Sequence, residues 1–172
     1  LLLYASRSFS HYFPKMKKIA LFVDVQNIYY TTRQAYGRQF NYREFWQRIS
    51  SEGDIVLANA YAIDRHDQKQ VQFQNVLKKI GFTIKLKPYI QRSDGTSKGD
   101  WDVGITIDIM QTAKDVDSVI LLSGDGDFDL LLLEIRRGFD VTTEVYGVPT
   151  LTANSLINAA NIFNPIKTDL LL

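Results

Sequence analysis

The chain has 172 residues, 45% of them apolar and 23% charged, which is typical of one soluble globular domain with a substantial core. It has no cysteine and two histidines, which excludes a disulfide framework and a cysteine-based zinc site and leaves oxygen ligands, favouring Mg²⁺ or Mn²⁺, for any metal. The net charge of +1, from 20 Lys and Arg against 19 Asp and Glu, produces no global field that would attract a nucleic acid.

Residues 1–15 are interpreted as a leader or an extraneous extension, because they are basic and aromatic without clear periodicity. A signal peptide could begin at Met16, but Asp24 interrupts the apolar segment too early, and no run reaches the length of a membrane span. We expect the folded domain at 16–166 and a tail at 167–172, and we assign the leucine triplets at both ends no role in the fold. The absent signals and cysteines favour a cytoplasmic protein without membrane contact.

Apolar runs and amphipathic stretches alternate along the chain and predict strands and helices in turn. Asn41 is a candidate cap for the first expected helix, Gly81 ends the second, and Pro88 suits a strand nearer the sheet edge. This alternation over short connections indicates one α/β domain with a mainly parallel sheet. The expected strands are 18–25, 54–63, 82–91, 117–124 and 140–148, and the expected helices are 41–50, 64–82, 128–139 and 151–163.

The segment WDVGITIDIM, residues 101–110, fits two structures. Its apolar residues alternate from Trp101 to Ile109, which alone indicates a strand. A helix would instead place Val103 and Ile107 on one face. Because two parallel strands need a crossover between them, we predict a buried helix here.

Four carboxylates are expected at one edge of the predicted sheet. Asp24 ends the first strand, Asp125 and Asp127 follow the fourth in LLSGDGDFDL, and Asp102 begins the ambiguous helix. Each alone is an ordinary helix cap or turn former. Together they repel one another unless a divalent cation lies among them, as in phosphoryl-transfer and nuclease sites. Asp24 also ends an apolar run, a costly place for an unpaired charge.

The motifs FVDVQNIYY, SKGDWDVGITIDIM and LLSGDGDFDLLL, in this order and spacing, resemble the NYN domain of the LabA group. The resemblance covers about residues 17–165, and Ser155 is similar to a serine in the family's final helix. It implies an α/β fold, a PIN-like three-layer α/β/α sandwich with a mainly parallel central sheet, and a helix over 100–113. GDWDV has one residue more than the family pattern, so Asp100 is an alternative to Asp102 as a ligand.

The resemblance implies a metal-dependent endoribonuclease that hydrolyses RNA phosphodiester bonds. The expected cofactor is Mg²⁺ or Mn²⁺, one or two ions, held by Asp24, Asp102, Asp125 and Asp127. These four aspartates and Asn27 form the predicted catalytic set.

Substrate binding is expected from Lys98, Ser123, Arg33 and Arg65. Ser123 and Asn27 would orient the carboxylates or contact substrate, and Lys98 would meet a phosphate or remain a solvated loop residue. The expected partner is single-stranded or structured RNA, and a homodimer could form through aromatic residues near the leader. A wider track of cations and stacking rings would add Arg38, Arg43, His66, Lys69, Arg92, Tyr29, Tyr30 and Tyr36.

Two other functions fit parts of the sequence. A regulatory module that binds RNA or protein without turnover would suit the near-zero net charge, although such a module has little reason to keep mutually repelling acids. A phosphatase with Asp24 as nucleophile usually has a second acid two residues later, where this chain has Gln26.

Overall fold

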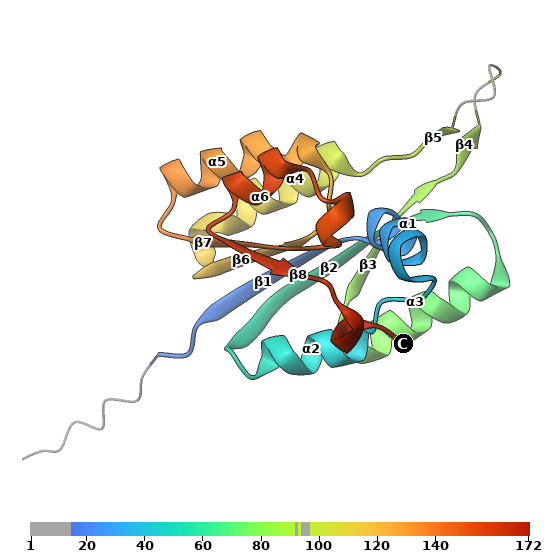
Figure 1. The fold of residues 1–172 in the computed structure, drawn as a ribbon, viewed down its shortest axis with the longest axis horizontal. Coiled ribbons are helices and arrows are strands. Elements are labelled where there is room, and N and C mark those ends of the chain that lie inside the picture. The colour runs from blue at the N-terminus through green and yellow to red at the C-terminus, as the bar shows by residue number, and fades with distance from the viewer. Residues whose placement is uncertain (1–14, 92, 94–96) are drawn as a thin grey trace, which may run out of the picture.

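The computed structural model describes residues 15–91, 93 and 97–172. Its centre is a six-stranded sheet of order β3-β2-β1-β6-β7-β8, in which all neighbouring strands are parallel (Figure 1). A separate antiparallel pair, β4 and β5, precedes α4. The strands are β1 (Lys18–Asp24), β2 (Asp54–Asp64), β3 (Thr83–Pro88), β4 (Ile90–Gln91), β5 (Ser97–Lys98), β6 (Ser118–Leu122), β7 (Thr142–Gly147) and β8 (Ile162–Pro165).

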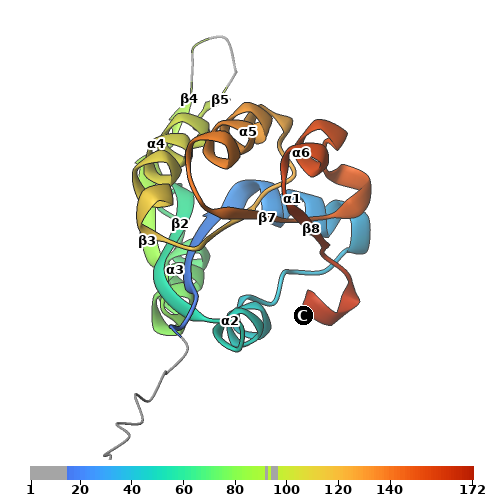
Figure 2. The same cartoon turned by 90° about the vertical axis from the view of Figure 1, so that its left-hand side faces the viewer.

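Helices cover both faces of the sheet and create three layers (Figures 1 and 2). The first three helices pack on one face and the last three on the other. Leu21 belongs to the first core and Phe22 to the second, so β1 is buried on both sides, as its continuous apolar run predicts. The predicted three-layer α/β fold is therefore confirmed. The helices are α1 (Val25–Tyr36), α2 (Tyr42–Ser50), α3 (Gln68–Ile80), α4 (Asp102–Thr112), α5 (Asp129–Gly138) and α6 (Asn154–Ala159), with 3₁₀ turns η1 (Ala113–Asp115), η2 (Gly126–Phe128), η3 (Pro149–Leu151) and η4 (Thr168–Leu170).

Helix α4 settles the ambiguous segment in favour of a helix. Ile105 and Ile109 are fully buried against the sheet, whereas Val103 and Ile107 are exposed. Both sets repeat every four residues, and interleaving them creates the alternation that imitates a strand. Strand β3 lies at the sheet edge, as expected around Pro88.

The structure divides the predicted strand 82–91 into β3 and β4, adds a helix that was not predicted and changes the end of another. The pattern does not predict α1, because this helix buries little beyond Val25, Ile28 and Thr32. The predicted helix 151–163 is wrong at its end, where the chain leaves α6 and forms the edge strand β8. Asn161 favours this exit, because its Oδ1 accepts hydrogen bonds from the backbone N–H and hydroxyl of Thr143 on β7, both at 2.9 Å.

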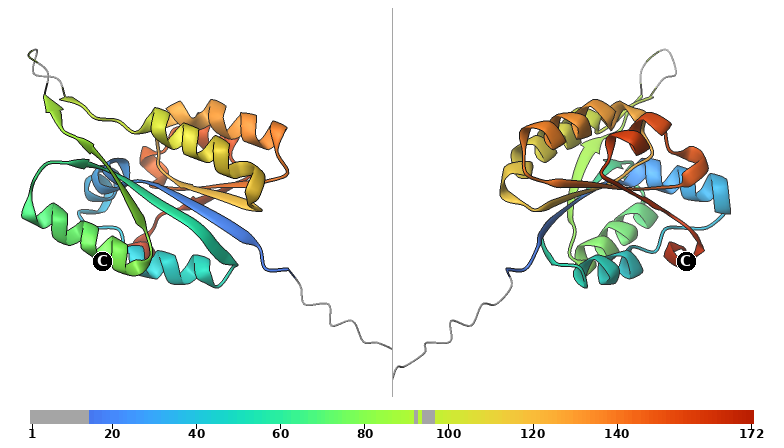
Figure 3. Two further views of the ribbon diagram at one scale, coloured as in Figure 1. Left: turned by 180° about the vertical axis from the view of Figure 1, so that it is seen from behind. Right: turned by 60° about the vertical axis from the view of Figure 1, so that its left-hand side comes forward.

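The C-terminal leucines belong to the fold, contrary to their expected lack of a role. Leu170 is fully buried and Leu171 nearly so, in the core shared with α1, α2 and α3. Figure 3 shows this end of the chain beside α2. Residues 1–14 of the predicted leader lie outside the described residues, and the predicted domain boundaries stay predictions.

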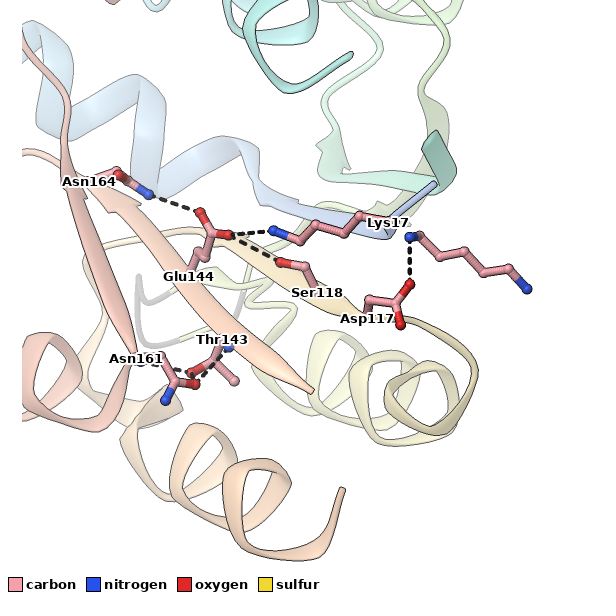
Figure 4. A network of polar contacts seen from close by, with 8 residues as sticks. Lys17, Asp117, Ser118, Thr143, Glu144, Asn161 and Asn164 are labelled. Atoms are coloured by element: carbon pink, nitrogen blue, oxygen red, sulfur yellow. Dashed lines mark hydrogen bonds and ion pairs between the residues drawn. The ribbon is translucent and has the colours of Figure 1, made fainter. Parts of the chain in front are cut away.

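A paired buried carboxylate lies at the end of the sheet where β6 and β7 begin (Figure 4). Glu144 is only 4% exposed. It accepts hydrogen bonds from Lys17 Nζ at 3.3 Å, Ser118 Oγ at 3.2 Å and Asn164 Nδ2 at 3.2 Å. Here the protein supplies both a cation and polar donors, as a buried charge requires.

No helix in the described part of the chain is long and apolar enough to cross a membrane.

Candidate metal centre

The predicted acids meet at the edge of the sheet where β1 and β6 end. These strands are parallel neighbours, and Val23 lies opposite Leu122 in their register. Asp24, the last residue of β1, and Ser123, the residue after β6, therefore lie side by side. The turn after β6 carries Asp125 and Asp127.

Three carboxylates converge closely at this edge. Asp102, Asp125 and Asp127 each offer one oxygen, and these oxygens lie within 4.8 Å of one another. Asp24 is not part of that group of three, but it lines the same cavity as Asp102, Asp125 and Asp100, with a volume of about 250 Å³. The fold thus gathers acids from three distant segments around one space.

Asp24 is held by both of its oxygens. Its Oδ1 accepts the backbone N–H of Asn27 at 3.2 Å and caps α1, which is the ordinary helix-capping role considered for this aspartate. Its Oδ2 accepts the Ser123 hydroxyl at 3.2 Å, and that hydroxyl accepts the backbone N–H of Asp125 at 3.2 Å. Ser123 is fully buried, and its hydroxyl orients Asp24 and the turn, which is one of the two roles expected of it; a contact with substrate stays a prediction.

Asn27 and Gly124 fix the turn after β6. Asn27 Oδ1 accepts the backbone N–H of Gly124 at 2.8 Å, which ties α1 to this turn. A Cβ on Gly124 would lie 2.5 Å from the carbonyl oxygen of Leu151, so the close approach requires glycine. Asp125 Oδ1 accepts the N–H of Asp127 at 3.0 Å and caps η2. Asp125 thus has a local structural role and still contributes to the acid group.

Burial and mutual repulsion oppose ionisation of Asp24. Burial is the largest cause and raises the pKa of Asp24 to about 6, and the nearby charges of Asp125 and Asp100 add to the rise. The hydrogen bonds from Asn27 and Ser123 act in the other direction without cancelling it.

Asp102 is perturbed in the same direction. Burial, followed by the charges of Asp125, Asp100 and its other acidic neighbours, raises the pKa of Asp102 to about 6. Asp102 lies in the first turn of α4, where the helix dipole favours a carboxylate. Burial and the surrounding acids together raise the pKa despite that dipole, and the acids leave negative charge in excess at this edge.

The residues of this edge fit a divalent cation. Among the described residues that line the acid cavity, none is a lysine or arginine. Glu144, the buried carboxylate of the opposite end, has Lys17 as its counter-charge. A group of hard carboxylate oxygens without a cationic partner is the donor set that Mg²⁺ and Mn²⁺ prefer.

A larger cavity of about 580 Å³ lies next to the acid cavity and shares Gln26, Tyr30 and Ile63 with it. The predicted substrate residues Arg33 and Arg65 both line it. So do three members of the wider track, Tyr29, Tyr30 and Lys69.

Other members of the expected track lie elsewhere. Arg38 donates to the backbone oxygens of Leu171 and Leu172, at 3.2 and 2.6 Å, and the Tyr36 hydroxyl donates to Ile166 O at 2.7 Å. These two side chains therefore stabilise the C-terminal segment. Arg43 and His66 line neither cavity, while Arg92 and the Lys98 side chain lie outside the described residues.

Comparison with known proteins identifies the family. The family model of the NYN domain matches residues 18–167. The chain belongs to the NYN domain family. It is 29% identical over 152 residues to the low amplitude and bright protein LabA of Synechococcus elongatus, which covers 84% of this chain and 81% of LabA. The crystal structure of a protein of unknown function from Vibrio parahaemolyticus is 52% identical, with a TM-score of 0.88, and covers 92% of this chain and 98% of that one.

Membership confirms the NYN resemblance and the PIN-like fold. The structure also shows the role of the tryptophan in GDWDV, the segment with one residue more than the family pattern. In this NYN domain Trp101 anchors the start of α4, because its indole Nε1 donates to Ala62 O at 2.8 Å and its ring packs edge-on against Tyr61. Asp102, directly after this anchor, joins the acid group, whereas Asp100 is exposed and does not. Sequence reasoning missed the anchor, since its partners lie on β2.

Proposed function

We propose that this NYN domain is a metal-dependent endoribonuclease that hydrolyses RNA phosphodiester bonds. The NYN family is a PIN-like nuclease family. The observation that carries the proposal is the convergence of Asp102, Asp125 and Asp127 within 4.8 Å, beside Asp24. No basic side chain among the described lining residues neutralises them.

Mg²⁺ or Mn²⁺ would be held by Asp24, Asp102, Asp125 and Asp127. When bound, such a cation lowers the pKa of water and neutralises the charge that develops on a phosphate. The protein's own contribution is to hold the carboxylates in place. Ser123 orients Asp24, and the Asn27–Gly124 hydrogen bond fixes the turn that carries the other acids.

RNA as the substrate is supported by two observations. Members of the NYN family bind RNA. The larger cavity beside the acids is lined by Arg33, Arg65 and Lys69, which can meet phosphate groups. The acids alone would repel a polyanion, so this neighbouring positive surface is part of the proposal.

The proposal is tested by incubating the purified protein with end-labelled single-stranded RNA and Mg²⁺ or Mn²⁺. Asp24→Asn and Asp125→Asn should each lower the cleavage rate at least about 100-fold, because each removes a ligand charge. Asp115→Asn is the matched control, since Asp115 is exposed on η1 outside the cavity, and it should cleave normally. Cleavage that persists with chelator or in both cavity variants would refute the proposed site.

A regulatory module that binds RNA without cleaving it is the alternative, and the net charge of +1 favours it. Calorimetry with Mg²⁺ separates the two, because such a module need not bind the ion.

The cytoplasmic location stays a prediction. So does the homodimer, because the leader aromatics on which it depends lie outside the described residues.

A further inference from the structure

The larger cavity differs in character from the acid cavity beside it. Its volume of about 580 Å³ lies in the range of small-molecule sites, whereas the acid cavity measures about 250 Å³. Gln26, Tyr30 and Ile63 line both. A ligand in the larger cavity therefore lies directly beside the acids.

The cavity combines an apolar floor with an aromatic rim. Ile28, Phe40 and Tyr42 on the floor are buried. At the rim, Tyr29 and Tyr30 are 45% and 50% exposed and their rings pack edge-on, so part of each residue is open to a ligand. A planar ligand with polar edges suits such a lining, because a ring can stack on the tyrosines and cover the apolar floor.

The rim is positively charged. Arg33, Arg65 and Lys69 line it against one acid, Asp67, so these lining residues carry a net charge of 3 − 1 = +2. Asp67 Oδ1 accepts the backbone N–H of Lys69 at 3.0 Å and caps α3, which commits one of its oxygens. This charge is opposite in sign to that of the acid cavity and suits a phosphate group.

The two arginines are held at the rim by their neighbours. Arg33 Nη1 donates to the Tyr29 hydroxyl at 2.9 Å, and its guanidinium carbon lies 5.3 Å from the centre of that ring. The Arg65 guanidinium lies 5.5 Å from the Tyr89 ring centre, and the Arg65 backbone N–H donates to Gln70 Oε1 at 2.8 Å. Side chains that are already ordered lose less conformational entropy when a ligand binds.

We propose that this cavity binds one unpaired nucleotide of the RNA strand, with its base against Tyr29 and the apolar floor and a phosphate at Arg33 and Arg65. The inference rests on the proposed function and extends it to the substrate class. The strand continuing from this nucleotide would pass Tyr30 and reach the acids. A base inside a duplex is stacked and paired and cannot enter, so the protein selects unpaired RNA.

The test measures RNA binding with chelator present, so that no cleavage occurs. Fluorescence anisotropy compares a short single-stranded RNA, its duplex, and a set of strands with one abasic position each. In the wild type, the duplex should bind about 5- to 100-fold more weakly than the intact strand, and so should the one abasic strand that lacks the base held in the cavity. Tyr29→Ala should cause a similar loss and abolish the effect of that abasic position, whereas Tyr29→Phe, which keeps the ring and loses only the hydrogen bond from Arg33, should lose much less and keep that effect.

A charge pair on α3 provides the matched control. Lys69→Ala and Lys78→Ala remove the same charge from the same helix, but only Lys69 lines the cavity. Lys69→Ala should weaken binding several-fold and Lys78→Ala should not. Equal binding of single strand and duplex, no effect of any abasic position, or equal losses in the two lysine variants would overturn the proposal.

Failure of this inference can be told apart from failure of the proposed catalysis. If RNA binding follows the pattern above but no cleavage occurs with Mg²⁺ or Mn²⁺, the catalytic proposal fails and the nucleotide cavity stands. If cleavage requires Asp125 but paired and unpaired RNA are cut equally and Tyr29→Ala has no effect, the cavity proposal fails and the catalytic one stands.

Discussion

Replacing Asp24 by asparagine should stabilise the metal-free protein at neutral pH. Burial raises the pKa of Asp24 from 3.8 to about 6, so the ionised carboxylate destabilises the folded state. Asparagine preserves the cap of α1, because its Oδ1 can accept from the Asn27 N–H. Its Nδ2 can donate to Ser123 Oγ, but the Ser123 hydroxyl then loses the carboxylate that accepts its proton, a cost of about 1 kcal/mol that does not change with pH.

The size of this effect follows from the pKa shift. The folded state binds the Asp24 proton more tightly than the unfolded state, so the wild type loses stability as the pH rises through the range from 3.8 to about 6. A shift of about two units corresponds to about 3 kcal/mol at pH 7.5 and about 1 kcal/mol at pH 4.5. The stability advantage of the variant should therefore grow by about 2 kcal/mol between these pH values, or about 4–8 °C in Tm.

Urea unfolding at the two pH values, followed by tryptophan fluorescence with chelator present, measures this difference. Asp115→Asn serves as control, because the exposed Asp115 lies outside the acid cavity. An Asp24→Asn advantage that does not change between pH 4.5 and 7.5, or a variant less stable than the wild type at pH 7.5, would refute the reasoning. Added Mg²⁺ should stabilise the wild type more than the variant.

Three further predictions concern the turn, the anchor and the ion. Gly124→Ala should lower the free energy of unfolding by about 2–4 kcal/mol, because its Cβ would lie 2.5 Å from a backbone oxygen. A Cβ on Gly138 meets nothing within 4 Å, so Gly138→Ala should not destabilise the protein. Equal denaturation midpoints for the two variants would contradict this. Trp101→Phe should lower the free energy of unfolding by about 1 kcal/mol through the lost indole hydrogen bond, and Trp101→Ala by roughly 2–3 kcal/mol. Trp101→Ala should also weaken Mg²⁺ binding measured by calorimetry. An unchanged affinity would show that the anchor does not position Asp102. Mg²⁺ affinity should fall as the pH drops below about 6, because Asp24 and Asp102 then bind protons in competition with the ion. An affinity that stays the same from pH 5 to 7.5 would argue against these ligands.

The sequence predicts the elements whose burial produces a simple pattern. The strand ending at Asp24 is buried on both faces and reads as a continuous apolar run. Strand β8 is short and only partly buried, so its pairing with β7 leaves no pattern that distinguishes it from the end of a helix. On α3, Leu77 is buried whereas Val71 and Val76 are about half exposed, so only part of its apolar residues face the core.

The candidate site was predictable in its chemistry and not in its surroundings. Asp24 and the acids of the GDGDF turn stand out because charges rarely follow buried strands without a reason. The burial of Ser123 and the contact of Trp101 with β2 depend on packing between distant segments, which no local pattern contains. For the same reason the sequence could not separate Arg33, which lines the larger cavity, from Arg38, which binds the C-terminal segment.

A crystal soaked in Mn²⁺ tests the central claim most directly, through the anomalous scattering of the ion. The account predicts a peak within coordination distance of Asp102, Asp125 and Asp127, beside Asp24, and its loss in Asp125→Asn. No peak at millimolar Mn²⁺, or one that persists unchanged in Asp125→Asn, would contradict the account.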